Sequence, residues 1–223
     1  MHEEVMWLDY VPGLNSLPHF VSYAILASFI LFVVAFIVSR NMSLVPGRIQ
    51  NFVEILAEAM LNLANETIGG HYGKHFFPLI ATIFLYIMTC NFMGLIPGFT
   101  SPTSNINMTA SMAIPVFLAT HVYGFKVHGP AYIKHFMGPM IALAPLMFPI
   151  EIISHLARPL TLAVRLFGNM VAKHKLLIVL GVLVPLVVPT AILVLGVLVS
   201  VVQAFVFALL TTIYLAGAVE EAH

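Results

Sequence analysis

The sequence predicts an all-α integral membrane protein, and two observations carry that prediction. Hydrophobic residues make up 61% of the 223 residues and charged residues only 8%, with a mean hydropathy of +1.02. Because a soluble domain carries about a quarter charged residues, this chain has too little polar surface to face water. Several of its apolar runs also reach the roughly 20 residues that a membrane-spanning helix needs.

The first predicted span covers residues 20–39. It follows an N-terminal segment, residues 1–19, that is acidic rather than basic. A cleavable signal has a basic start and a shorter apolar run, so we expect this span to stay as an anchor.

Residues 45–68 differ from the spans. Apolar residues recur at helical spacing from Phe52 to Leu63, while Glu54 and Glu58 fall on another face. This pattern predicts an amphipathic helix, which lies either along the cytoplasmic membrane surface or against other subunits.

Two further spans are expected at residues 76–97 and 108–125. Pro97 and Gly98 close the first of them. Cys90, the only cysteine, lies inside that run, so there is neither a disulfide framework nor a thiolate metal site.

The last two apolar regions are too long for perpendicular spans. Residues 138–183 contain Arg165, and residues 187–219 contain Gln203. At about 1.5 Å per residue each is longer than a bilayer is thick, so we expect a hairpin of two long, inclined helices. Bends are expected near the following prolines: Pro149, Pro159, Pro185 and Pro189.

The basic residues predict the orientation. They flank the connections at 40–75 and 126–137, whereas the loop at 98–107 has no Lys or Arg. Cytoplasmic loops are enriched in Lys and Arg, so the N-terminus is expected outside and both basic connections in the cytoplasm.

Three charges lie seven residues apart where charges are costly: Glu151, Arg158 and Arg165. On one continuous helix this spacing puts them along one stripe, and Asn169 extends it. Glu151 is about 20 Å along the axis from Arg165, which leaves Arg165 without an evident carboxylate in its own chain. We therefore expect its partner to come from another polypeptide; the alternative is a side chain that extends to the membrane surface.

The other polar residues allow two interpretations each. Arg158 and Lys175 fit side chains that reach the membrane surface, and Lys173 fits either that role or an inward one. Glu151 favours a wet path more than a structural role, and Ser154 and His155 beside it strengthen that interpretation.

Residues 176–219 contain no charge, and Gln203 and Tyr214 fall on nearly the same helical face. Both fit either a polar pathway or hydrogen bonds that hold helices together.

The ten histidines do not predict a metal site. Neither the His71 and His75 pair nor the series His121, His128 and His135 has acid or cysteine companions, so we expect interfacial histidines. No phosphate-binding loop or nucleophile constellation occurs, so no cofactor, no metal and no catalysis by the chain itself are expected.

The run from Glu151 to Ala172, with its core Arg165-Leu-Phe-Gly-Asn-Met170, resembles the signature of subunit a from bacterial F-type ATP synthases. The resemblance covers most of the chain from about residue 75. Further matching segments are Gln203-Ala-Phe-Val-Phe with Tyr214, Phe76 to Pro78, Asn91, Ile96-Pro97-Gly98 and Asn105-Ile-Asn-Met-Thr.

By that resemblance, the long hairpin lies along the rotor, and Arg165 is the stator arginine that faces the essential carboxylate of the rotating c-ring. Asn169 lies beside it and Gln203 packs opposite. Glu151 with Ser154 belongs to an aqueous route. His174 falls in the inlet path, and Tyr214 belongs to the last helix. His155 and Lys173 are further candidates for groups that relay protons or tune the channel.

The sequence departs from many relatives at two positions. Lys173 stands where a small residue is usual, and Gly196 where a histidine or an acid is common.

The resemblance implies a multi-pass subunit of a bacterial plasma membrane with a cytoplasmic C-terminus. Its implied partners are the c-ring, the peripheral-stalk b subunits, the other synthase subunits and the bilayer, with no nucleic acid. Its implied function is to supply two half-channels for protons, or alternatively sodium ions. An autonomous secondary transporter is the rival interpretation, although neither inverted repeats nor a midplane acid–base pair is evident.

Overall fold

The computed structural model describes residues 18–40, 42–43, 47–96, 98–129, 132, 144–183 and 187–219. Within these residues it contains helices and no strand. In chain order the elements are α1 (His19–Arg40), α2 (Arg48–Ile68), α3 (Gly70–Met93), the 3-10 helix η2 (Pro102–Ser104), α4 (Ile106–His128), α6 (Ala144–Leu183) and α7 (Val187–Val219). Three parts of the predicted layout lie outside the described residues: residues 1–17 of the N-terminal segment, residues 138–143 of the first long helix, and His135.

The chain is an all-α membrane protein, as the sequence predicts. Within the described residues, four helices are long and apolar enough to cross a membrane: His19–Arg40, His71–Met93, Ile106–His128 and Thr190–Val219. The first three match the expected spans, although α3 begins earlier and α4 ends later than hydropathy alone predicts. Their ends carry polar residues that continue the helix beyond the apolar run.

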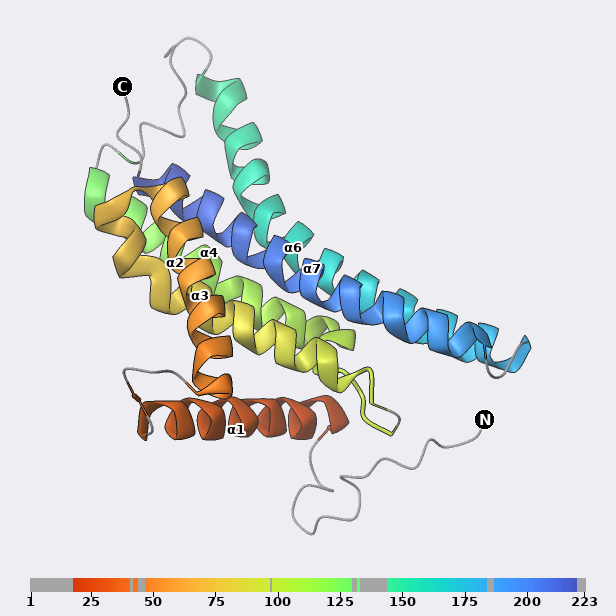
Figure 1. The fold of residues 1–223 in the computed structure, drawn as a ribbon. Helices are drawn as coiled ribbons and strands as arrows, with labels where there is room; N and C mark the ends of the chain where they lie inside the picture. Colours follow the sequence, from red (N-terminus) through yellow and green to blue (C-terminus); the bar gives the residue numbers. More distant parts are fainter. Residues whose placement is uncertain are drawn as a thin grey trace.

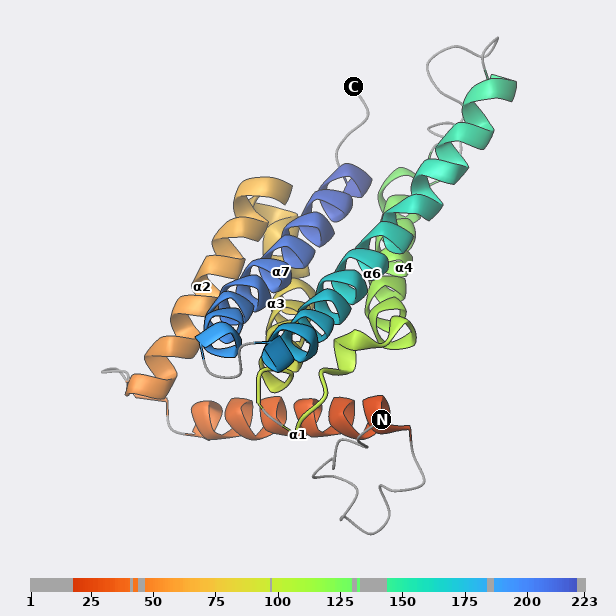
Figure 2. The same ribbon diagram turned by 90° about the vertical axis from the view of Figure 1, so that its right-hand side faces the viewer.

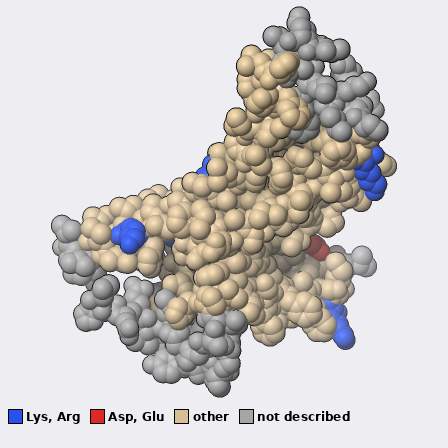
Figure 3. All heavy atoms as spheres, turned by 180° about the vertical axis from the view of Figure 1, so that it is seen from behind, with Lys and Arg blue, Asp and Glu red and all other residues tan. Residues whose placement is uncertain are grey.

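Much of the surface of the described helices is apolar. On the face in Figure 3, charged side chains form small, separated patches among uncharged ones. Large apolar side chains are exposed along α1, such as Phe29 and Phe32. Such a surface is disfavoured in water and is the one expected against lipid.

The core lies where α3, α4, α6 and α7 meet. Ile80, Phe84 and Ile87 of α3 are buried in one cluster with side chains of these helices and of α2. Ala204 and Ala208 of α7 are fully buried, and small side chains at this spacing let helix backbones approach closely.

The long hairpin forms as expected. Helices α6 and α7 run side by side in both ribbon views, and α6 bends along its length (Figures 1 and 2). Pro149 and Pro159 lie inside α6 without ending it, Pro189 falls in the first turn of α7, and Pro185 is outside the described residues. The 40 residues of α6 extend about 60 Å, roughly twice the bilayer core. This helix must therefore be inclined if it stays in the membrane.

Helix α2 leaves the Arg40 end of α1 and runs across its direction (Figures 1 and 2). It packs along α3 and α7. The close contact with α3 depends on Gly73, because a Cβ there would lie 2.9 Å from the backbone oxygen of Ala64. If α1 crosses the bilayer, this direction places α2 along a membrane face.

Candidate ion-translocation site

Arg165 lies on the outer flank of α6. Leu162, Leu166 and Met170 are buried at a spacing of four residues and form the stripe that faces the core. Arg165 falls outside that stripe and is exposed. The carboxylate residues that the structure describes are Glu54, Glu58, Glu66 and Glu151, and none of them forms an ion pair with Arg165.

One turn beyond Arg165, a hydrogen bond joins the two helices of the hairpin. Asn169 Nδ2 on α6 donates to Gln203 Oε1 on α7 at 2.5 Å. Gln203 is only 5% exposed, and among the described residues its Nε2 has no hydrogen-bond partner. A buried amide donor that makes no hydrogen bond costs about 1–3 kcal/mol.

Lys173 turns inward instead of reaching for the membrane surface. Its Nζ lies 3.4 Å from Ser200 Oγ and 3.5 Å from the backbone oxygen of Asn91. Gly196 leaves the room for this side chain, because a Cβ there would lie 3.2 Å from Lys173 Cδ and 2.8 Å from Leu95 Cδ2. The two departures noted in the sequence are therefore neighbours in space.

Lys173 is the inner end of a buried polar chain that continues toward the loop before α4. Asn91 donates to the backbone oxygen of Ser200 at 3.4 Å and accepts from Thr103 Oγ1 at 2.7 Å. Thr103 and Ser101 hydroxyls lie 2.6 Å apart. Asn91, Thr103 and Ser200 are fully buried. The signal that could have found the chain is the presence of these polar residues inside or beside apolar runs.

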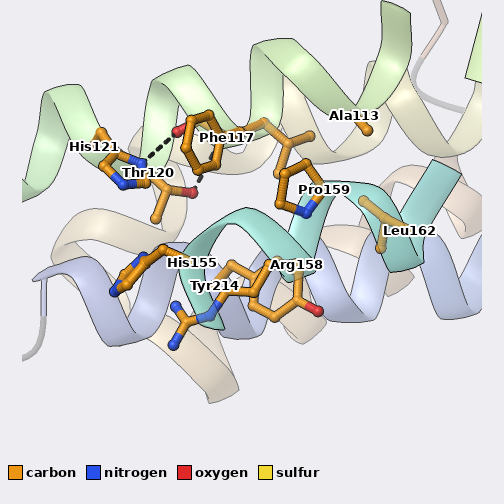
Figure 4. A pocket seen from close by; sticks show the side chains of 10 residues that line it. Ala113, Phe117, Thr120, His121, His155, Arg158, Pro159, Leu162 and Tyr214 are labelled. Atoms are coloured by element: carbon orange, nitrogen blue, oxygen red, sulfur yellow. Dashed lines mark hydrogen bonds between the residues drawn. The ribbon is translucent and has the colours of Figure 1, made fainter. Parts of the chain in front are cut away.

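A second polar cluster surrounds Glu151 near the start of α6. His155 Nε2 lies 3.3 Å from Glu151 Oε1. A carboxylate only accepts, so this nitrogen carries the hydrogen. The ring of His121 on α4 lies against that of His155, with centroids 5.2 Å apart, and both point into the space between α4 and α6 (Figure 4).

His121 is predicted from the sequence to be an interfacial histidine. Its Nδ1 lies 2.9 Å from the backbone oxygen of Phe117, so Nδ1 carries the hydrogen and Nε2 is the acceptor of the neutral ring. Only helix packing brings it to His155, because the two residues are far apart in the chain. No spacing rule could have found this pair.

A cavity lies between these rings and α7. It is lined by both histidines, Arg158, Tyr214 and apolar side chains, and about 10 Å³ of it is open to the centre of a water-sized sphere. That is room for about one water. Arg158 is half-buried, and its guanidinium lies 5.4 Å from the centre of the Tyr214 ring (Figure 4).

The remaining predicted residues join neither cluster by a contact. Ser154 is exposed on α6, and His174 is half-buried with no hydrogen bond or ion pair to another described residue. The structure thus separates the predicted site into a group around Arg165, Asn169 and Gln203 and a group around Glu151. In the described part of the chain, no three His, Cys, Asp or Glu side chains are grouped to hold a metal ion.

Comparison with known proteins shows the family of the chain. The family model described as ATP synthase A chain matches residues 21–216. "ATP synthase subunit a 3" of Pelobacter propionicus is 51% identical over 203 residues, which are 91% of this chain and 88% of that protein. "ATP synthase subunit a" of Trichlorobacter lovleyi is 52% identical over 194 residues, covering 87% and 84%.

A third relative, "ATP synthase subunit a" of Geobacter sulfurreducens, is 49% identical over 203 residues, covering 91% of this chain and 88% of its own. The match runs across all the described helices that carry the two polar clusters. The chain therefore belongs to the ATP synthase A chain family.

Proposed function

We propose that this chain is the ion-conducting stator of the synthase membrane sector, and that Arg165 keeps two aqueous half-channels apart. The observation that carries the proposal is the exposed position of Arg165 on α6, without an ion pair to any described carboxylate. An arginine in apolar surroundings costs about 3 kcal/mol on insertion scales. A carboxylate on another subunit offsets that cost.

The partner carboxylate belongs to the rotating c-ring. The guanidinium keeps its charge at any accessible pH, so it favours the ionised carboxylate and repels a cation carried toward it. A ring carboxylate must release its ion before it passes Arg165. An ion can enter or leave the ring only through a polar route, and Arg165 separates one such route from the other.

The two polar clusters supply those routes. On the outer side, the chain from Ser101 through Thr103, Asn91 and Ser200 to Lys173 connects the loop before α4 with the hairpin. Lys173 tunes this route, and His174 lies beside it on α6.

On the cytoplasmic side, His155 and His121 border a cavity with room for about one water, and Glu151 contacts His155. Ser154 and Tyr214 complete this side. Imidazoles titrate near neutral pH, which favours protons over sodium ions as the cargo.

Rotation converts the membrane potential into work. Each elementary charge that crosses gains about 2.3 kcal/mol per 100 mV. The chain has no catalytic role itself, and ATP forms elsewhere in the complex. Asn169 and Gln203 keep the two helices of the hairpin in register beside Arg165, so that the guanidinium meets each passing carboxylate at the same depth.

The subunit sits in a bacterial plasma membrane with its N-terminus outside and its C-terminus in the cytoplasm. The basic residues that flank the helix ends support this orientation. Helix α2 lies along the cytoplasmic face, and peripheral-stalk b subunits contact the side of the chain away from the ring. The whole chain forms one membrane domain.

The test is ATP-driven proton pumping by inverted vesicles that contain the complete synthase. Arg165→Ala should abolish coupled pumping, whereas Lys175→Ala, which removes another exposed cation of α6, should leave it nearly unchanged. Coupled pumping by the Arg165→Ala complex contradicts the proposal. So does ion transport by the chain reconstituted alone, which is the behaviour of an autonomous transporter.

A further inference from the structure

Helix α3 begins and helix α4 ends at the same end of the helix bundle (Figure 1). An open cleft lies between them there. About 670 Å³ of it is open to the centre of a water-sized sphere. This volume falls within the range of about 300–1,000 Å³ that ligand pockets occupy. The cleft is separate from both polar clusters described above.

The walls of the cleft are basic. Lys74 and Lys126 contribute two basic side chains, His71 and His75 add two imidazoles, and none of the described Asp or Glu residues lines the cleft. The cleft therefore favours an anion.

The geometry of the walls is fixed by contacts between the two helices. Tyr123 of α4 packs edge-on against the buried ring of Phe76, with centroids 4.6 Å apart. Its hydroxyl lies 2.6 Å from His75 Nε2, and Lys126 Nζ lies 5.6 Å from the centre of its ring. Hydrogen-bond donors from α3 and α4 are thus held on opposite sides of one opening.

An apolar row leads from the cleft along α4. Ile114, Leu118 and Val122 are exposed and lie four residues apart, and Lys126 is the next position of the same row. Acyl chains can lie along this row while a headgroup phosphate stays at the lysine. A free phosphate ion would make no use of it.

We propose that this cleft binds the phosphate headgroup of an anionic phospholipid, whose acyl chains lie along the exposed row of α4. Lys74 and Lys126 pair with the phosphate from the two helices, and Tyr123 and the histidines supply hydrogen bonds. The bound lipid fixes the corner between α3 and α4 at the membrane surface. The site does not depend on Arg165 or on ion transport.

The experiment compares lipid binding by the complete synthase and its variants. Each complex is purified in mild detergent, stripped of lipid, reloaded with phosphatidylglycerol or phosphatidylcholine, and examined by native mass spectrometry. Each lysine near a membrane surface contributes about a fivefold gain for an anionic lipid. Lys74→Gln with Lys126→Gln should therefore weaken phosphatidylglycerol binding about 30-fold. Phosphatidylcholine binding should not change.

Three controls make the result decisive. Lys175→Gln removes a lysine outside the cleft and should bind like the wild type, whereas equal loss in this control overturns the proposal. Lys126→Arg keeps the charge and should retain the lipid. This variant still tests the proposal if the complex with both lysines replaced does not assemble. Displacement by millimolar inorganic phosphate identifies a simple anion site and also overturns it.

A protein occupant is the remaining alternative. A photoreactive crosslinker on Lys126→Cys in membranes should label phospholipid. Labelling of a peripheral-stalk helix in its place overturns the proposal. Neither labelling result depends on pumping by the Arg165 variants. The lipid-site proposal and the stator proposal are therefore tested independently.

Discussion

The side chain of Lys173 fills the space that Gly196 leaves open between α6 and α7. A Cβ at position 196 would lie 3.2 Å from Lys173 Cδ, and the ammonium group reaches Ser200 and Asn91 beyond it. The lysine thereby enters the helix bundle instead of the surrounding lipid. Two positions that are separate in the sequence act as one unit.

Gly196→Ala should push the lysine from its polar contacts and slow ATP-driven pumping several-fold. Lys173→Ala removes one of the two side chains that the new methyl group would meet, the other being Leu95. Neighbouring residues couple by about 0.5–3 kcal/mol, so the double variant should lose less than the sum of the two single effects. A double-mutant cycle on pumping rates measures the coupling, and strictly additive effects would show that the two residues do not interact.

Gln203→Leu should loosen the hairpin beside Arg165. It removes the acceptor of the Asn169 amide at a buried position. Hydrogen bonds between membrane helices contribute about 0.6 kcal/mol on average and about 1.7 at most, so we expect a destabilisation in that range. Reversible unfolding of the detergent-solubilised chain measures it. Thr161→Val is the matched control, because the Thr161 hydroxyl bonds only within α6 to the Arg158 carbonyl.

His121→Phe should slow proton flux on the cytoplasmic side. It removes the imidazole that lies against His155 but keeps a ring of similar size. An imidazole can accept and donate a proton, whereas a phenyl ring cannot, so passive proton flux through vesicles should fall several-fold. His128→Phe, two turns further along α4, should leave the flux intact. An unchanged flux in His121→Phe excludes a relay role for this residue.

Gly73→Val should separate α2 from α3. The added Cβ would meet the Ala64 carbonyl at 2.9 Å, and a backbone group cannot move aside as a flexible side chain can. Overpacking of this kind costs about 1–3 kcal/mol. The thermal unfolding temperature of the purified chain should fall, while Gly217→Ala, where nothing lies within 4 Å, should change it little.

The helix plan could be predicted from the sequence, because hydropathy and length depend on local composition. The spans, the amphipathic pattern of α2 and the long hairpin all follow from that information. The contact between Glu151 and His155 was also accessible, since residues four apart share a helix face.

Contacts between helices were not accessible. The sequence left Lys173 either at the membrane surface or inside, and only the neighbouring Gly196 and Ser200 decide this. His121 reaches His155 only because α4 packs against α6. Contacts between helices depend on how each helix is rotated about its axis and on the angle at which two helices cross. The spacing of residues along one helix determines neither.

Glu151 and Arg165 belong to one uninterrupted helix, which continues through Pro159. One residue inserted between them would turn one end by about 100° relative to the other. If Arg165 kept its place, the polar cluster around Glu151 would point away from α4. If that cluster kept its place, Arg165 would be turned from its present direction. Evolution of this segment is therefore restricted to substitutions, whereas insertions and deletions can be absorbed only in the loops.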